Sequence, residues 1–150
     1  MGKLLSFETG VVEYDINGAA KVRFNPTDAE FTERLYRAFS ALDAKQEGYR
    51  ERVSEIGDDR EGMFEYARER DAEMRAIIDG LLGEGVADAL FPDMNCYALA
   101  DGLPVWVNLM FAIADEIHDA YTTQEKKGDP RVKAYNQKYT KMMSKYKRGK

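Results

Sequence analysis

The sequence predicts an α+β fold that is mainly α, with an N-terminal β-hairpin or small sheet followed by about four helices and a basic C-terminal helix. Residues 11–24 alternate apolar and charged side chains on both sides of an Asn-Gly pair, which is typical of a hairpin. Most of residues 25–125 repeat apolar side chains every three or four positions, which is typical of helices. With 150 residues and one cysteine, the chain is expected to form one apolar core without an internal disulfide.

Two pairings of the hairpin are compatible with its turn. A two-residue turn centred on Asn17 and Gly18 would place apolar side chains opposite charged ones. A three-residue loop, Ile16-Asn17-Gly18, gives one apolar face and one face of matched charges, so it is the favoured pairing. Residues 3–9 are expected to add a third strand, because a lone hairpin is rarely stable. The favoured loop pairs Tyr14 with Ala20, Val12 with Val22, and Glu13 with Lys21.

The first two helices have recognisable start and stop signals. Asn25 is expected to be the N-cap of a helix with Pro26 in its first turn, and this helix is expected to end at Gly57. Asp58 and Glu61 have the spacing of a capping box for the second helix. Their predicted buried stripes are Phe31, Leu35, Phe39, Leu42, Tyr49, Val53 and Ile56 in the first helix, and Phe64, Ala67, Met74, Ile77, Ile78 and Leu81 in the second, with Asp71 as a polar exception.

Glycines at 80, 83 and 85 then interrupt the helical pattern. Val86 to Leu90 is expected to form one short helical turn, and residues 91–95 a loop. Gly102-Leu103-Pro104 precedes the most apolar segment, which is expected to be the central helix. Its predicted buried face is Val105, Trp106, Leu109, Met110, Ile113 and Ile117.

The charge of the chain is divided unevenly between two predicted parts, residues 1–125 and residues 126–150. The first part holds twelve Lys/Arg and twenty-six Asp/Glu, a net charge of −14, whereas the second holds ten Lys/Arg and one acid, a net charge of +9. Residues 126–130 are expected to be a linker, with Asp129 and Pro130 starting a separate basic amphipathic helix.

One side of this basic segment carries the candidate partner-binding residues. Their spacings of three and four match the seam of a coiled coil, but two heptads are too short to be stable alone. The seam is therefore expected to dock on the acidic body of the same chain, on another copy or a partner helix, or on nucleic acid. Nucleic acid is disfavoured by the acidic body, and a membrane by the lack of leucine and tryptophan on the seam. The seam residues are Val132, Tyr135, Tyr139, Met142 and Tyr146.

Signals for catalysis are weak, and the sequence predicts a protein that is not an enzyme and uses no cofactor or metal. The single histidine, His118, lies three residues after Asp115, so the two could share a helix face but would make at most half of a metal site. Cys96 has no neighbouring cation in the sequence and is expected to be a packed thiol. The Gly80–Gly85 segment lacks the lysine and the preceding strand of a phosphate-binding loop.

In the order of its elements, the chain resembles the tail assembly chaperones of long-tailed phages and prophages of Gram-positive bacteria. The resemblance covers roughly residues 7–120. It rests on Tyr14-Asp15-Ile16-Asn17-Gly18, on Phe24-Asn25-Pro26-Thr27-Asp28 leading into the long helix with Phe31 and Leu35, on Leu81-Leu82-Gly83-Glu84-Gly85 with Phe91, and on the apolar helix after Gly102.

This resemblance implies a non-enzymatic role in phage tail morphogenesis. Such chaperones bind the long helical tape-measure protein, recruit tail-tube subunits and leave before the virion is complete, so these two structural proteins are the expected partners, with a homo-oligomer as a further possibility. The single cysteine and this role both place the chain in the cytoplasm of a bacterial host. The alternative is a nucleic-acid-binding or regulatory protein of a mobile element that acts through its basic C-terminal tail.

Overall fold

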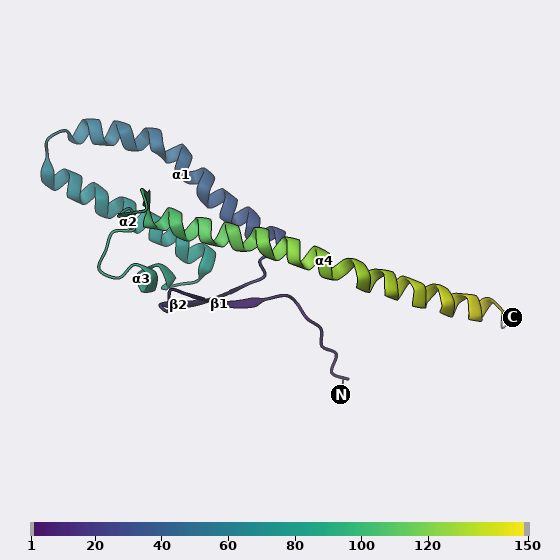
Figure 1. Ribbon diagram of the computed structural model, residues 1–150. Helices are drawn as coiled ribbons and strands as arrows, with labels where there is room; N and C mark the ends of the chain where they lie inside the picture. The colour runs from purple at the N-terminus through teal and green to yellow at the C-terminus, as the bar shows by residue number, and fades with distance from the viewer. Residues whose placement is uncertain (1, 149–150) are drawn as a thin grey trace.

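The computed structural model describes residues 2–148, apart from the side chains of residues 41–44, 46, 47, 129, 135 and 146–148. It confirms the predicted mainly α architecture with an N-terminal hairpin (Figure 1). Among the described helices, none combines the length and apolar character needed to cross a membrane. The elements are β1 (Val12–Ile16), β2 (Ala20–Phe24), α1 (Ala29–Ile56), α2 (Arg60–Leu82), α3 (Val86–Leu90), β3 (Leu99–Ala100), β4 (Leu103–Pro104) and α4 (Val105–Arg148).

The predicted alternation of the hairpin is confirmed, but the predicted pairing is wrong by two residues. The antiparallel strands place Val12 opposite Phe24 and Tyr14 opposite Val22. Asn17 and Gly18 both have positive φ, and the N–H of Ala19 donates to the carbonyl of Ile16, as in a type I′ turn. Ile16 pairs with Ala20, so Ala19 is an extra unpaired residue and the loop has three residues, Asn17, Gly18 and Ala19. This loop contains the turn at Asn17 and Gly18 and begins one residue later than the predicted loop.

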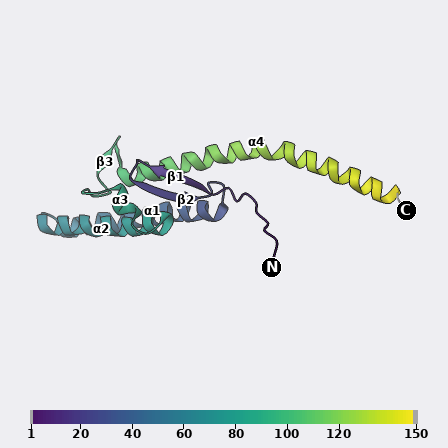
Figure 2. The same cartoon turned by 90° about the horizontal axis from the view of Figure 1, so that it is seen from below.

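The predicted third strand does not form. Residues 2–11 have no regular secondary structure, and Figures 1 and 2 show this segment leading away from the body. Its large apolar side chains are not buried against the hairpin, since Leu4, Leu5 and Phe7 are 94%, 89% and 82% exposed. The segment therefore has no apolar contact that would hold it beside the hairpin as a third strand. The hairpin is stabilised instead by the helices around it, between α1 and α4 (Figure 2).

Both helix starts differ from the prediction. Asp28, not Asn25, caps α1 by accepting a hydrogen bond from the N–H of Glu30. The amide group of Asn25 is already used, since it accepts from Thr27 and donates to the carbonyl of Thr9. Asp59 caps α2 in place of the predicted Asp58. The end of α1 at Gly57 is confirmed, with φ at 59° in the left-handed region that glycine tolerates.

The core forms where α4 crosses α1, α2 and the hairpin (Figure 2). The rings of Phe24 and Phe31 stack at 4.2 Å and join β2 to α1. The hydroxyl of Tyr14 donates to Glu116 at 2.9 Å and joins β1 to α4. Two members of the predicted α2 stripe, Phe64 and Ala67, are exposed, and the prediction for Leu42 lies outside the described side chains. The buried core consists of Val22, Phe24, Phe31, Leu35, Met74, Ile78, Leu81, Val86, Ala87, Phe91, Cys96, Trp106, Leu109, Met110 and Ile113.

The predicted linker at residues 126–130 is wrong, because α4 is one continuous helix that contains Pro130. The basic helix is therefore the second half of α4 and not a separate element. A proline removes one backbone donor and disturbs one turn, yet the helix continues through it. The division of the chain into residues 1–125 and 126–150 stays a prediction. Figures 1 and 2 show the second half of α4 extending well beyond the body.

Candidate functional site

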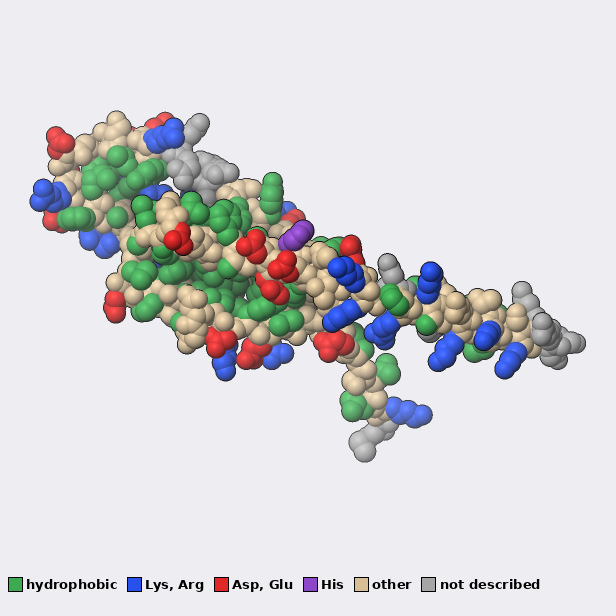
Figure 3. Space-filling view, viewed as in Figure 1, with side chains coloured by type: hydrophobic (Ala, Val, Ile, Leu, Met, Phe, Trp, Pro, Cys, Tyr) green, Lys and Arg blue, Asp and Glu red, His purple; other side chains and the backbone are tan. Residues whose placement is uncertain are grey.

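The basic second half of α4, residues 126–148, lies free of the body. No hydrogen bond or ion pair between described residues joins it to another element. Figure 3 shows basic side chains along this projecting end and acidic side chains where α4 crosses the body. The predicted docking on the acidic body of the same chain is not seen, because the continuous helix carries this half away from it.

The structure places three of the five candidate partner-binding residues on this projecting half as exposed apolar side chains. Val132, Tyr139 and Met142 are 59%, 51% and 59% exposed. Residues Tyr135 and Tyr146 belong to the same helix, but their side chains lie outside the described part of the structure. No described part of the body covers these three side chains, so the stripe is available to a partner.

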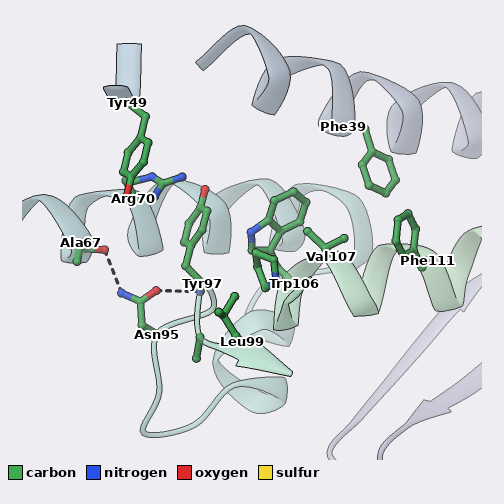
Figure 4. A pocket seen from close by; sticks show the side chains of 12 residues that line it. Phe39, Tyr49, Ala67, Arg70, Asn95, Tyr97, Leu99, Trp106, Val107 and Phe111 are labelled. Atoms are coloured by element: carbon green, nitrogen blue, oxygen red, sulfur yellow. Dashed lines mark hydrogen bonds between the residues drawn. The ribbon is translucent and has the colours of Figure 1, made fainter. Parts of the chain in front are cut away.

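A second candidate surface is an open groove of about 800 Å³ between the α1–α2 pair and the start of α4 (Figure 4). It was not predicted, because its residues come from four segments that are distant in the sequence. Its walls are mostly aromatic and aliphatic. The lining residues are Phe39, Tyr49, Ala67, Arg70, Asn95, Tyr97, Ala98, Leu99, Pro104, Trp106, Val107 and Phe111.

Aromatic contacts fix one wall of this aromatic groove. The ring of Phe39 on α1 lies 6.2 Å from that of Phe111 and 6.4 Å from that of Trp106, both on α4. Tyr97 meets Trp106 edge to face at 5.9 Å. Such arrangements suit the charge distribution of aromatic rings, so they hold the wall in place before any partner binds.

The start of α4 is positioned by the loop that precedes it. The N–H of Val105 donates to the carbonyl of Ala98 at 2.8 Å, and that of Trp106 donates to the carbonyl of Cys96 at 3.2 Å. These bonds satisfy donors that a helix start would leave unpaired. The small antiparallel pair β3–β4, which was not predicted, brings Leu99 to the groove, where its side chain is 71% exposed.

A guanidinium group lies at the end of the groove away from Phe39 and Phe111 (Figure 4). Arg70 of α2 stacks between two rings, 3.7 Å from the centroid of Tyr49 and 4.0 Å from that of Tyr97. Both distances allow a cation–π interaction. Burial raises the pKa of the Tyr97 hydroxyl, although the nearby Arg70 opposes this shift. Tyr97 is therefore neutral near pH 7, and the wall presents flat, rigid surfaces.

The indole N–H of Trp106 has no hydrogen-bond acceptor among the described protein groups. The residue is only 6% exposed, so this donor is buried. Figure 4 shows it pointing towards Tyr97. An N–H directed at an aromatic ring is a weak contact, and it is weaker than a full hydrogen bond. The wall of the groove therefore contains one buried donor that makes no full hydrogen bond with the described groups.

An ion-pair network beneath the groove explains the polar exception in α2. The carboxylate of Asp71 accepts from Arg75 at 2.9 Å and from the backbone N–H of Cys96 at 2.7 Å. Arg75 also donates to Asp88 and to the carbonyl of Phe91. Burial opposes ionisation of Asp71, but the bonds from Cys96 and Arg75 outweigh it, so the pKa of this carboxyl is lowered.

This network anchors the loop of residues 91–98, and with it the groove, to α2. Sequence reasoning missed Arg75. The available signal was its position four residues after Asp71, the one acid within an apolar stripe.

The residues considered for catalysis, Cys96, Asp115 and His118, lie in different surroundings. Cys96 is fully buried, and burial raises the pKa of its thiol to about 12, which confirms a packed thiol. Asp115 and His118 are exposed, and the part of the chain that the structure describes contains no group of three or more His, Cys, Asp or Glu suited to a metal. At the glycine-rich segment, Asp79 accepts from the N–H groups of Gly85 and Ala87, which a phosphate would need.

Comparisons of the chain with protein-family models, with curated proteins and with solved structures found no match. The resemblance to tail assembly chaperones therefore stays a prediction from the sequence. Within the described residues, the aromatic groove and the exposed stripe of α4 are two surfaces that a partner could cover.

Proposed function

We propose that this chain is a non-enzymatic tail assembly chaperone that holds an apolar helical segment of the tape-measure protein in its aromatic groove and works with tail-tube subunits in the cytoplasm of a bacterial host. The observation that carries the proposal is an open groove with aromatic walls on an acidic body. The resemblance supplies the identity of the partner, and the groove supplies a place to bind it.

The shape and chemistry of the groove suit one face of an amphipathic helix. Helices that bind grooves insert apolar side chains three or four positions apart, and a volume of about 800 Å³ accommodates several of them. Aromatic residues dominate the binding energy of many interfaces because they bury a large rigid surface. Since the ring of Trp106 already packs against those of Phe39 and Tyr97, little ordering is needed on binding.

The charge of the body favours a helix with basic flanks. Residues 1–125 carry a net charge of −14, so a basic segment is attracted and an acidic one is repelled. Such charges act on the rate and selectivity of association more than on its strength. A chaperone that has to leave before assembly ends needs a contact of this reversible kind.

The test is coexpression with fragments of a tape-measure protein from the same genome, followed by calorimetric titration of the purified pair. Leu99→Glu places a carboxylate at the exposed edge of the groove. It is expected to weaken binding at least about tenfold, because a charge would be buried against an apolar face. Leu103→Glu, on the paired strand outside the groove, is the matched control and is expected to change binding by less than about twofold.

The proposal fails if no fragment binds or gains solubility, or if both variants bind as tightly as the native chain. Thermal melting of the two variants separates a loss of binding from a loss of folding.

A second candidate function, binding of nucleic acid by a regulatory protein of a mobile element, is favoured by the projecting half of α4. Residues 126–148 contain nine Lys/Arg around the exposed Tyr139, which could stack on a base. This function predicts retardation of DNA or RNA that weakens steeply with salt. Replacement of Lys133, Lys138 and Lys141 by glutamine is expected to abolish it, whereas it would leave tape-measure binding in the groove intact.

A further inference from the structure

The exposed apolar side chains of α4 form one stripe along nearly the whole helix. Five large apolar residues of this helix are exposed in the described part of the structure: Phe111, Tyr121, Val132, Tyr139 and Met142. All five fall on the two core positions, a and d, of a single seven-residue repeat. Residues 135 and 146, both tyrosines, occupy the same positions in the sequence.

This stripe is much longer than the seam at the C-terminal end. From residue 111 to residue 146 the repeat spans five heptads, or roughly 50 Å of helix at 1.5 Å per residue. Two heptads are too short for a coiled coil, but five are enough. The stripe differs from the buried face of α4, which consists of Trp106, Leu109, Met110 and Ile113.

Charge changes sign along the same helix. Residues 105–125 contain four acids and no Lys/Arg, whereas residues 126–148 contain nine Lys/Arg and one acid. A parallel pair of such helices would bring two strongly basic halves together. An antiparallel pair brings each basic half against an acidic half, and repulsion becomes attraction.

We propose that two copies of this chain associate through antiparallel pairing of their α4 helices along this stripe. The partner must be a separate chain, because the unbroken helix holds the basic half away from its own body. In an antiparallel coiled coil, the a positions of one helix face the d positions of the other. When the apolar residues of the two stripes are matched in this way, the centre of the pair lies between Lys126 and Lys127. Phe111 then faces the partner's Met142, and Tyr121 faces the partner's Val132.

The middle of the stripe is polar, and this favours one alignment over others. His118, Glu125 and Gly128 occupy core positions between the apolar ends. Polar core residues lower the stability of a coiled coil but fix its register. The same alignment brings the basic end of each copy to Phe111, at the edge of the other copy's aromatic groove. This self-association does not depend on the proposed chaperone function.

The first experiment measures the mass of the full-length chain by light scattering during gel filtration, at loading concentrations from about 5 to 500 µM. The expected result is a concentration-dependent rise towards twice the 17.1 kDa of one chain. Tyr139→Glu combined with Met142→Glu is expected to weaken the dimer at least about 100-fold, because four charges would enter the apolar ends of the pair.

The matched control is Gln137→Glu combined with Ser144→Glu. It adds the same charges to the same half of α4, but on the side of the helix opposite the stripe. It is expected to weaken the dimer less than about tenfold, by charge alone. All four positions are exposed, so the variants do not disturb the core, and equal helical circular dichroism verifies this.

The second experiment tests the antiparallel direction with a spin label at Ser144→Cys, since the native Cys96 is fully buried and is not labelled. An antiparallel pair separates the two labels by roughly 50 Å along the helix axis. A parallel pair would hold them within roughly 30 Å, because paired helices lie 8–10 Å apart and both labels point outward from the pair. Labels at Lys127→Cys are expected to be close together in either case and confirm that the pair is formed.

The proposal is overturned if the chain stays monomeric over the whole concentration range, if the stripe and control variants behave alike, or if the labels at residue 144 lie close together. A mass that rises only when nucleic acid or a tape-measure fragment is added also overturns it, since the occupant of the stripe would then be that partner and not a second copy.

Discussion

The two halves of α4 share one helix but have opposite surroundings. Residues 105–125 pack on the body, where Trp106, Leu109 and Met110 are nearly fully buried. Residues 126–148 make no hydrogen bond or ion pair with another element among the described residues, and Val132, Tyr139 and Met142 are more than half exposed. The body half has a buried face and an exposed stripe, whereas the projecting half has the stripe alone. A repeat of apolar residues therefore indicates that a face can be covered, but the fold decides what covers it.

The largest expected effect comes from making the same substitution in the two halves. Met110 is 1% exposed and Met142 is 59% exposed. Met110→Ala is expected to lower the free energy of unfolding by about 2–5 kcal/mol, because it leaves a cavity in the core. Met142→Ala is expected to change it by about 0.5 kcal/mol or less. Urea unfolding at low protein concentration measures both values, and similar costs would show that the projecting half packs on the body.

A second test loosens the network that anchors the loop leading into α4. Asp71→Asn removes the charge that pairs with Arg75, and it is expected to cost about 1–3 kcal/mol near pH 7. The pKa of Asp71 is lowered in the folded state, so its contribution is fully present above the unfolded pKa near 3.8 and is lost as pH falls through the folded value.

The free energies of unfolding of the native chain and of Asp71→Asn are therefore expected to differ by a constant amount from neutral pH down to about pH 5, and by less below about pH 4. Glu69→Gln, an exposed substitution on the same helix, is the control and is expected to be near neutral. An equal difference at pH 3 and pH 7 would contradict the assigned role of the carboxylate.

The smallest effect on global stability is expected from Pro130→Ala, at the point where the two halves of α4 meet. Proline inside a helix costs up to about 3 kcal/mol locally. Its replacement is expected to slow hydrogen exchange of the amides near residues 126–134, while the unfolding of the core stays nearly unchanged. Faster exchange in the variant would indicate that this segment is not helical in solution.

Much of the fold could be predicted because its signals are local. The alternation of the hairpin, the stop at Gly57, the short helix Val86–Leu90 and the apolar helix after Pro104 all depend on near neighbours in the chain. The errors arose where two local signals competed. Asn25 has the chemistry of an N-cap, but its amide is occupied by Thr27 and Thr9. Pro130 is typical of a helix start, yet the helix on its N-terminal side continues through it.

The candidate site was less predictable than the fold. The five seam residues were found from their spacing, and the three whose side chains are described are exposed. The identity of the partner that binds them stays a prediction. The aromatic groove could not be found in this way, since Phe39, Arg70, Leu99 and Trp106 come from different elements. Their proximity depends on how α1, α2 and α4 cross.

The sequence alone was enough to predict the secondary structure class, the buried faces of most helices, and the strong contrast of charge between the body and the C-terminal end. These properties follow from periodicity, capping and composition, which are carried by residues close together in the chain. The folded structure was needed to show that the basic segment continues the central helix, that it extends beyond its own body, and that an aromatic groove opens beside the start of that helix. Those features depend on packing between segments far apart in sequence, where small differences in burial free energy select one arrangement.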